Sequence, residues 1–407
     1  LDHLVLLPRP IEAKKAYDDD VVGTLDDYAF LRWTSGMEKM ELQHLVRNVR
    51  RTTMTREEKL KLHRQAVLHW EECAETPDDQ IVLLFHRICS ESEDLDSHCG
   101  AAVEKLVSTH SSALSVLLEQ AIELSEQPSY LHYLAAKVAL DRCEPKHTHR
   151  HLQHIEEEGY SNEIDMGLAY LEGRIDDAEK AIKKGLSIGS QHQKNQLALA
   201  AASRRLDDRI DDTLTKDTVL QIKQYISNII LPENAQQRAV TIVALTMVQH
   251  ALALAEENFV KAETLRATLV SVGGIDDAFV LGLEAKASLV EAKKNPHHFA
   301  SAIERTKRAL AHQSSPLHRD SLRLTFVEAL FEHDLDQAKI EFLQVSKPNS
   351  DPNHVLLHRL HARWWMCKSN LEPTLRQIAL KEAITQHRAA GCPRAANILE
   401  ARLHSLL

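Results

Sequence analysis

The chain has 407 residues, of which 43% are hydrophobic and 27% charged, and its formal net charge is −10. It contains 12 Gly and 12 Pro, against about 28 and 20 expected from average usage, so the frequent turns of a β-barrel or β-sandwich are excluded. The negative charge provides no broad basic surface, which argues against a nucleic-acid partner. This composition predicts a large, mostly helical soluble protein.

Cysteine usage and the chain start indicate the setting of the protein. Six cysteines are scattered between Cys73 and Cys392 without C-x-x-C spacing, so we expect reduced thiols and a cytoplasmic location. The start at Leu1 has neither Met nor a signal-peptide pattern, and we interpret the chain as a fragment of a longer protein. The longest uncharged run, 239–255, is interrupted by polar residues and is shorter than the roughly 20 residues of a spanning helix. It predicts a buried core helix and no membrane contact.

Sequence-readable catalytic motifs are absent. The chain has no P-loop, no G-x-G-x-x-G, no G-x-S-x-G and no H-E-x-x-H, each of which places backbone or side-chain groups locally for one chemistry. We therefore expect no enzyme activity and no catalytic residue, and no nucleotide hydrolase that is complete within this chain.

Residues 1–70 differ from the rest and predict a small separate module. Residues 28–33 are rich in aromatic side chains and predict a strand, residues 34–36 a turn and 37–43 a second strand, which together make a hairpin. Leu42, Leu45, Val46 and Val49 then follow the spacing of one helix face. Thr55 with Glu58 forms a capping box that opens a helix carrying His63, Ala66 and Trp70 on its inner side.

This order of elements resembles a known family. The segments 42–47 (LQHLVR) and 57–66 (EEKLKLHRQA) are similar to the winged-helix segment that follows the ATPase core in STAND NTPases, a family of multidomain signal-transduction proteins. The resemblance implies a winged-helix-like module that leads into tetratricopeptide-like hairpins sensing an inducer. It also implies ATP or ADP as a cofactor of an upstream NTPase module, while no cofactor is expected within this chain itself.

The same resemblance marks a nucleotide-sensing position at the end of the second strand. The family commonly places a His there, whereas this chain has Gln43 followed by His44; Gln donates a hydrogen bond but carries no charge. The alternative is a polar strand end with a half-buried core His. Nearby, Arg47, Arg50 and Arg51 share one helix face, which would suit phosphates, a solvated surface or an intramolecular domain contact.

Residues 71–407 predict helical hairpins in series. After a helix with Ile164, Leu168 and Leu171 on one face, Gly173 ends the helix. Asp176 with Glu179 is expected to cap the next helix, and Ala178 stands five residues after the glycine. Weaker copies of this pattern occur at Ala262, Ala302, Ala338 and Ala396. The spacing is that of degenerate tetratricopeptide-like repeats, whose stacking builds an α-solenoid with a concave surface that typically binds a peptide or protein.

Two histidine clusters are candidate sites. His147, His151 and His154 are spaced to lie on one helix face, as weak candidates for a metal site, with a solvated polar face as the alternative. His354, His358, His361 and Trp365 share another helix face, and a Trp beside cationic groups is typical of an interface hot spot; packing against the next hairpin is the alternative. The acidic runs 18–20 and 156–158 are interpreted as solvated, and the aspartates at 207, 208, 211 and 212 as helix caps.

The sequence therefore predicts an all-α fold. A winged-helix-like module with a β-hairpin (1–70) precedes a tetratricopeptide-like superhelix (71–407). We expect the sensor region of a STAND-type regulator that binds a protein or peptide inducer on its concave face, with self-oligomerisation through an upstream module. A stand-alone scaffold or adaptor without nucleotide-driven switching is the alternative.

Overall fold

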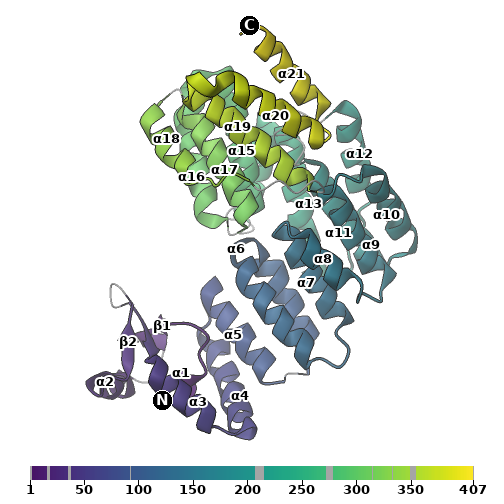
Figure 1. Ribbon diagram of the computed structural model, residues 1–407. Helices are drawn as coiled ribbons and strands as arrows, with labels where there is room; N and C mark the ends of the chain where they lie inside the picture. The colour runs from purple at the N-terminus through teal and green to yellow at the C-terminus, as the bar shows by residue number, and fades with distance from the viewer. Residues whose placement is uncertain are drawn as a thin grey trace. The chain divides into compact units, whose positions relative to one another are not determined.

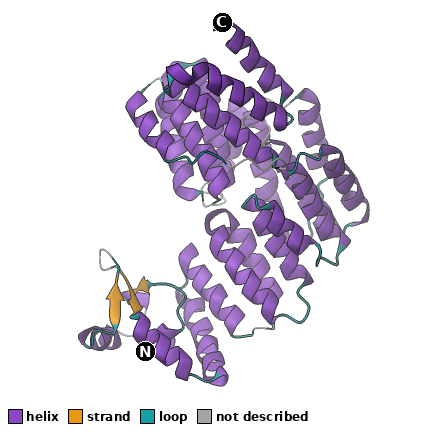
Figure 2. Cartoon of the chain, in the orientation of Figure 1, coloured by secondary structure: helices purple, strands orange, loops and turns teal. Residues whose placement is uncertain are grey.

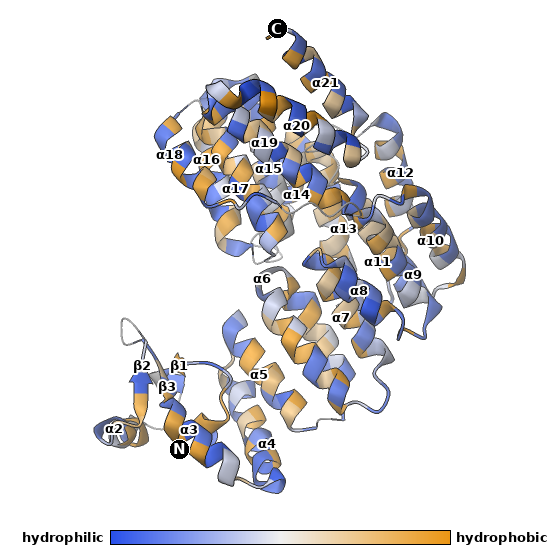
Figure 3. Ribbon diagram, in the orientation of Figure 1, coloured by the Kyte–Doolittle hydropathy of each residue, from blue (hydrophilic) through white to orange (hydrophobic). Residues whose placement is uncertain are grey.

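A computed structural model gives the fold of residues 2–15, 19–34, 38–91, 93–206, 215–271, 278–313, 315–331, 333–348 and 354–406. Within these ranges the chain is almost wholly helical, with one small antiparallel sheet near its start (Figures 1 and 2). Most helices pack as antiparallel hairpins and alternate hydrophobic with hydrophilic residues (Figure 3). The predicted all-α, tetratricopeptide-like hairpin fold with a small N-terminal sheet is confirmed. The chain divides into two compact units, Leu1–Ala135 and Ala136–Leu407.

The first unit contains the sheet and the long helices that come after it. Its elements are α1 (Asp2–Val5), β1 (Ile11–Glu12), the 3-10 turn η1 (Ala13–Lys15), α2 (Asp19–Asp27), β2 (Leu31–Trp33), β3 (Lys39–Leu42), α3 (His44–Thr53), α4 (Arg56–Cys73), α5 (Pro77–Cys89), α6 (Leu95–Leu124) and the start of α7 (Ser129–Asp141).

The sheet contains the predicted hairpin and one further strand. β3 is central and pairs antiparallel with β2, where Leu31 faces Leu42, and with β1, where Ile11 faces Met40. Residues 35 and 36 of the predicted turn and residue 37 of the predicted second strand lie outside the described residues. The two-residue β1 was not predicted, because two residues are too few to show an alternating pattern.

One apolar core joins the sheet to the helices after it. Met40 and Leu42 of the sheet pack in the same cluster as Trp70 of α4 and Val82 of α5. The Thr55–Glu58 capping box is present at the start of α4, with the Thr55 N–H donating to Glu58 Oε2 at 2.7 Å. Because α4 runs across residue 70, the core is continuous there. The predicted module boundary at residue 70 is not tested by this and stays a prediction.

The second unit is built from helical hairpins. From α9 onward, the first helix of each hairpin packs against the first helix of the next hairpin. Its helices after α7 are α8 (Pro145–Leu152), α9 (Glu158–Leu171), α10 (Ile175–Ile188), α11 (Gln191–Leu206), α12 (Lys216–Ser227), α13 (Ala235–Ala255), α14 (Phe259–Ser271), α15 (Ala278–Lys294), α16 (Phe299–His312), α17 (Pro316–Leu330), α18 (Leu335–Leu343), α19 (Val355–Leu371), α20 (Arg376–Ala389) and α21 (Pro393–His404), with 3-10 turns η3 (Pro296–His298) and η4 (Pro373–Leu375). The helices α9, α11, α13, α15, α17 and α19 contact one another in series, as repeat stacking requires.

Four hairpin turns share one backbone geometry. Each has a residue with positive φ just past the helix, namely Cys143 (57°), Gly173 (73°), Glu257 (57°) and Gly391 (68°). In each turn, the residue after the one with positive φ donates its backbone N–H to the carbonyl oxygen of the residue five positions before it, at 2.8–2.9 Å. This is the 6→1 hydrogen bond of the Schellman motif. A small buried residue stands five positions after each of them: Thr148, Ala178, Ala262 and Ala396. The predicted pairing of Gly with Ala five residues later is confirmed at Gly173 and Gly391.

The predicted cap of α10 is wrong. The helix begins at Ile175 with Arg174 as its N-cap residue, so Asp176 lies inside the first turn. Glu179 does not return to the helix start; it accepts hydrogen bonds from Arg205 (2.6 Å) and from the Tyr225 hydroxyl. The predicted caps at 207, 208, 211 and 212, and Asp18 of the first acidic run, lie outside the described residues.

One helix and the cysteines bear on the cellular setting. The segment Gln237–Ala255 of α13 is long and apolar enough to cross a membrane, but 44% of it is buried in the fold, and Val248, Ala251 and Leu252 lie in the core of the second unit, as a core helix requires.

All six cysteines are thiols; Cys99, Cys143, Cys367 and Cys392 are buried, and Cys73 and Cys89 are partly exposed. A cytoplasmic location stays a prediction.

Candidate functional site

The corner between β3 and α3 holds the predicted nucleotide-sensing residues. The N–H of Gln43 donates to the Phe30 carbonyl oxygen (2.8 Å), and its side chain is exposed and forms no helix cap. His44 is also exposed, and its Nδ1 accepts a hydrogen bond from Arg47 at 3.0 Å. The structure therefore excludes a half-buried core His at 44. Nucleotide sensing at this corner stays a prediction.

Helix α3 presents apolar side chains to solvent. Leu45 is 75% exposed and Val49 is 56% exposed, and α3 has no buried residue. Of the predicted helix face, Leu42 is buried and Val46 packs against the core of the first unit, whereas Leu45 and Val49 lie on the solvent side. Arg50 instead binds Asp2 of α1 (2.7 Å), which fits the alternative of an intramolecular contact for this arginine.

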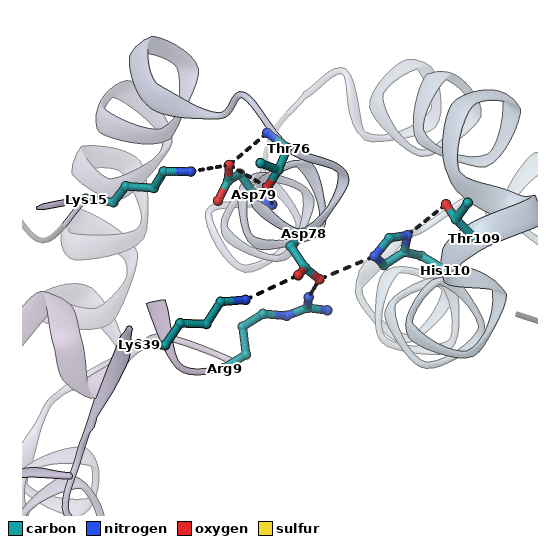
Figure 4. Close-up of polar contacts among 8 residues, drawn as sticks. All are labelled: Arg9, Lys15, Lys39, Thr76, Asp78, Asp79, Thr109 and His110. Carbon is teal, nitrogen blue, oxygen red and sulfur yellow. Dashed lines mark hydrogen bonds and ion pairs between the residues drawn. The ribbon is translucent and has the colours of Figure 1, made fainter. Parts of the chain in front are cut away.

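Asp78, at the start of α5, is the centre of a charged junction (Figure 4). Its Oδ1 pairs with Arg9 and lies 3.3 Å from Nε2 of His110, and its Oδ2 lies 3.5 Å from Nζ of Lys39. Burial works to raise the pKa of Asp78, but Arg9, His110 and Lys39 together hold it below its usual value. Arg9 and Lys39 belong to the sheet region and His110 to α6. One carboxylate therefore ties three parts of the first unit together.

Asp79 makes a second, more buried link beside it (Figure 4). Its Oδ2 accepts from Lys15 Nζ at 2.6 Å and from the Thr76 N–H at 2.8 Å, the latter as part of a capping box. The hydrogen bond to Asp79 raises the pKa of Lys15. Lys15 and Asp79 are both buried, and a buried pair keeps its charge only when each partner is satisfied. The start of α5 is thereby fixed against the segment that comes after β1.

The Asp78 junction includes His110, the one residue with non-helical backbone angles among the described residues of helix α6. His110 has φ −131° and ψ 28° inside that helix, so α6 is kinked there. The side chain at the kink is the one that reaches Asp78, while its Nδ1 lies 2.8 Å from the Thr109 hydroxyl. A change in how Arg9 and Lys39 hold Asp78 would therefore act directly on the kink, because all of these groups share one carboxylate.

Sequence reasoning missed this junction. The spacing of Thr76 and Asp79 is a readable capping signal and could have been found. The partners of Asp78 lie 69 residues away at Arg9 and 32 residues away at His110, and no local pattern connects them.

The C-terminal histidine stripe lies between helices. His354, His358 and His361 are all buried. His354 Nε2 donates to the Cys143 carbonyl oxygen (3.0 Å), and His358 Nδ1 lies 2.8 Å from Gln386 Oε1 on α20. These are contacts of packing against neighbouring hairpins, which was the alternative to partner binding.

Trp365 ends the same stripe and is partly exposed. Its indole N–H donates to His361 Nε2 (3.1 Å), and the Lys347 ammonium lies 4.9 Å from its ring centre. Burial and the positive Lys347 lower the pKa of His361, so the ring is neutral and accepts that bond. Partner binding by these four residues stays a prediction.

The other histidine cluster does not form one helix face. His147 is exposed and pairs with Glu144 (3.1 Å), whereas His151 is buried. Helix α8 ends at Leu152, so His154 lies in the turn beyond it. The predicted common face is therefore wrong at His154. Among the residues that the structure describes, no three His, Cys, Asp or Glu side chains are grouped closely enough to hold a metal ion.

Comparisons with known proteins add a structural likeness. No family model matches the chain, and no curated protein sequence matches it. Among solved structures, a STAND (signal transduction ATPase with numerous domains) protein with a tetratricopeptide repeat sensor from Pyrococcus horikoshii is similar, with a TM-score of 0.44 and 14% sequence identity. The match covers 98% of this chain and 64% of that protein, so this chain spans less than two thirds of its length.

Proposed function

We propose that this chain is the recognition and coupling region of a STAND-type signal-transduction regulator. In this proposal the helical hairpins bind a protein or peptide inducer on their concave side, and the N-terminal module passes the binding event to an attached NTPase module. The inducer would favour one of two conformations by binding it more tightly. The chain itself carries out no chemistry, and ATP or ADP would bind only to the attached module.

The observation that carries the proposal is the surface around Gln43 and His44. Two exposed polar side chains at the predicted sensing position lie at the start of a helix whose Leu45 and Val49 are largely exposed. Exposed large apolar side chains next to a polar group are typical of a surface that contacts another protein segment. An NTPase module joined upstream would cover these residues.

The Asp78 junction supplies a route for coupling. It connects the sheet region to the first long hairpin through ion pairs, which are sensitive to small displacements because their energy depends on geometry. An inducer that repositions α5 or α6 would therefore alter the contacts of Arg9 and Lys39. In this proposal the N-terminal module senses the state of the hairpins at that point.

Two experiments test the proposal. Reading the native gene upstream of Leu1 should reveal a P-loop motif; an initiator Met immediately before Leu1, without such a motif, would overturn it. In the native protein, Leu45→Ser with Val49→Ser should change nucleotide exchange, whereas Val116→Ser on α6, which is 69% exposed, should not. Equal effects of both would argue against a contact at α3.

The alternative is a scaffold without nucleotide-driven switching. It predicts that partner affinity is the same with ATP and with ADP. The switching proposal predicts that the two affinities differ at least about fivefold, the lower end of typical coupling between sites.

A further inference from the structure

The stacked helices of the second unit form a series whose ends meet. The helices α9, α11, α13, α15, α17 and α19 contact one another in that order, and α19 also contacts α9. In an open solenoid each repeat contacts only its neighbours in the chain. A contact between the first and the last helix of the series therefore needs residues that join the two ends, and such residues lie at the turn between α7 and α8.

The end of α7 leaves backbone oxygens that its own helix cannot satisfy. The last carbonyl oxygens of any helix lack an intrahelical partner. Four positions after Asp141 stands Pro145, which has no backbone N–H to donate. Cys143, in the same turn, is 4% exposed, and a buried carbonyl oxygen needs a donor. This turn therefore depends on donors from other parts of the second unit.

The donors come from the first residues of two later helices. At the start of α17 the Ser315 hydroxyl donates to the Asp141 carbonyl oxygen at 3.1 Å and makes no capping bond to its own helix. At the start of α19 the Nε2 of His354 donates to the Cys143 carbonyl oxygen at 3.0 Å. Ser315 and His354 are both buried. Two hydrogen bonds thus connect residues that are 174 and 211 positions apart along the chain.

His354 also fixes the start of its own helix. Its Nδ1 accepts a hydrogen bond from the Leu357 N–H at 3.3 Å, so the ring carries its proton on Nε2, the atom that donates to Cys143. The next residue, Val355, lies so close to Gly173 in the turn after α9 that a Cβ added at 173 would overlap its Cγ2. The hydrogen bond to Cys143 and the close packing at Gly173 therefore both depend on where α19 begins.

We propose that these contacts form a clasp that holds the series closed and opens on its own while the hairpins stay folded, so that α19 separates from α9. The clasp consists of residues 141–143 and Gly173 on one side, and of Ser315, His354 and Val355 on the other. Its contacts are few, and a hydrogen bond between neutral groups shifts an equilibrium by only about two- to tenfold. By contrast, α9 shares an apolar core with α11 and α13, and α19 shares another with α17. Regions held by few buried apolar contacts open before the rest of a protein.

The clasp itself does not depend on the proposed function, since all of its contacts lie within the second unit. Its regulatory role does rest on the proposed function: opening of the clasp would control how an inducer reaches the stacked helices. Experiments on the chain alone therefore test the clasp whether or not an inducer binds.

Hydrogen exchange measured by mass spectrometry on the whole chain tests the clasp. Ser315→Ala combined with His354→Asn removes both hydrogen bonds, because Asn still caps α19 but is too short to reach Cys143. Backbone amides in the α7–α8 turn and in the first turns of α17 and α19 should exchange about tenfold faster, while amides of α13 and α15 should keep their rates. The control combines Ser369→Ala, which removes a buried hydroxyl that donates to its own helix (2.7 Å), with His404→Asn at an exposed position. It should change none of these rates.

Steric overlap at Gly173 provides a second route to the open state. Gly173→Ala pushes on Val355, so it should accelerate exchange in the same three segments, and adding Val355→Ala should reverse this. Gly391→Ala, in a turn of the same geometry where an added Cβ meets no atom within 4 Å, should not accelerate them.

Small-angle scattering shows whether the two ends of the series separate. Gly173→Ala combined with Ser315→Ala and His354→Asn should raise the radius of gyration, while circular dichroism shows an unchanged helix content. Faster exchange without a larger radius of gyration would mean local fraying and would overturn the proposal. Equal acceleration in the clasp, α13 and α15 would also overturn it, because the second unit would then open only as a whole, and so would unchanged exchange in the clasp variants.

Discussion

Replacing two turn glycines by alanine should separate backbone strain from steric overlap. Gly391 has φ 68°, and a Cβ added there would meet no atom within 4 Å. Gly173 has φ 73°, but a Cβ added there would overlap Cγ2 of Val355 on α19. The two turns have the same Schellman hydrogen bonds, so the backbone cost of alanine should be the same in both.

The magnitudes come from these surroundings. A left-handed conformation destabilises a residue with a Cβ by about 1–2 kcal/mol. Alanine also reduces the conformational entropy of the unfolded chain, which offsets this by about 0.4–1 kcal/mol. Gly391→Ala should therefore lower the free energy of unfolding by about 1 kcal/mol. Gly173→Ala should lower it by about 2–4 kcal/mol, because moving Val355 adds the usual cost of overpacking, about 1–3 kcal/mol.

Urea unfolding at constant m-value measures both changes, and native-state hydrogen exchange assigns them to the second unit. The double variant Gly173→Ala with Val355→Ala should remove the steric part, so that alanine at 173 costs about as much as alanine at 391. Equal destabilisation by the two single variants, or no coupling between positions 173 and 355, would refute this reasoning.

Substitutions at four other places test single contacts. Glu257→Gly should raise the free energy of unfolding by up to about 1 kcal/mol by relieving the same strain at φ 57°, whereas Glu256→Gly, inside the hydrogen-bonded turn, should lower it. Burial lowers the pKa of His63 to about 4 and that of His86 to about 3, whereas a histidine in the unfolded chain has a pKa near 6.5. Below pH 6.5 the unfolded chain therefore binds more protons than the folded chain, and the free energy of unfolding should fall by about 2 kcal/mol per histidine between pH 7.5 and pH 5. His63→Phe should reduce this pH dependence, while His147→Asn should not. Asp78→Asn should speed hydrogen exchange around His110 and cost about 1 kcal/mol, with Asp177→Asn as an exposed ion-pair control that leaves this exchange unchanged. Glu328→Gln should destabilise by about 3 kcal/mol because it leaves the buried Arg363 without its counter-charge, and a loss of less than about 1 kcal/mol in urea unfolding would contradict this.

Local signals in the sequence were sufficient for the hairpins. The Thr55–Glu58 capping box and the turns at Gly173 and Gly391 are set by residues within about one helical turn, so their spacing predicts them. Cys143 and Glu257 adopt the same turn without glycine. Residue type did not reveal the positive φ of these two residues, because packing of the flanking helices compensates for a strain of only about 1–2 kcal/mol.

Partners far apart in the chain could not be predicted. A periodic apolar face indicates a helix, but it does not say whether another segment covers that face, so the exposure of Leu45 and Val49 could not be predicted from their spacing. The Asp78 junction depends on Arg9 and Lys39 meeting α5 in space.

The buried cysteines make the protein a reporter of its own local opening. Burial raises the pKa of the Cys99 thiol to about 12 and also raises that of Cys367, so neither forms the reactive thiolate while its helix stays packed. Cys99 lies in the first unit and Cys143, Cys367 and Cys392 lie at three places in the second. The rate at which an alkylating reagent reaches each sulfur in the native protein would therefore show, without any added label, which hairpins separate first.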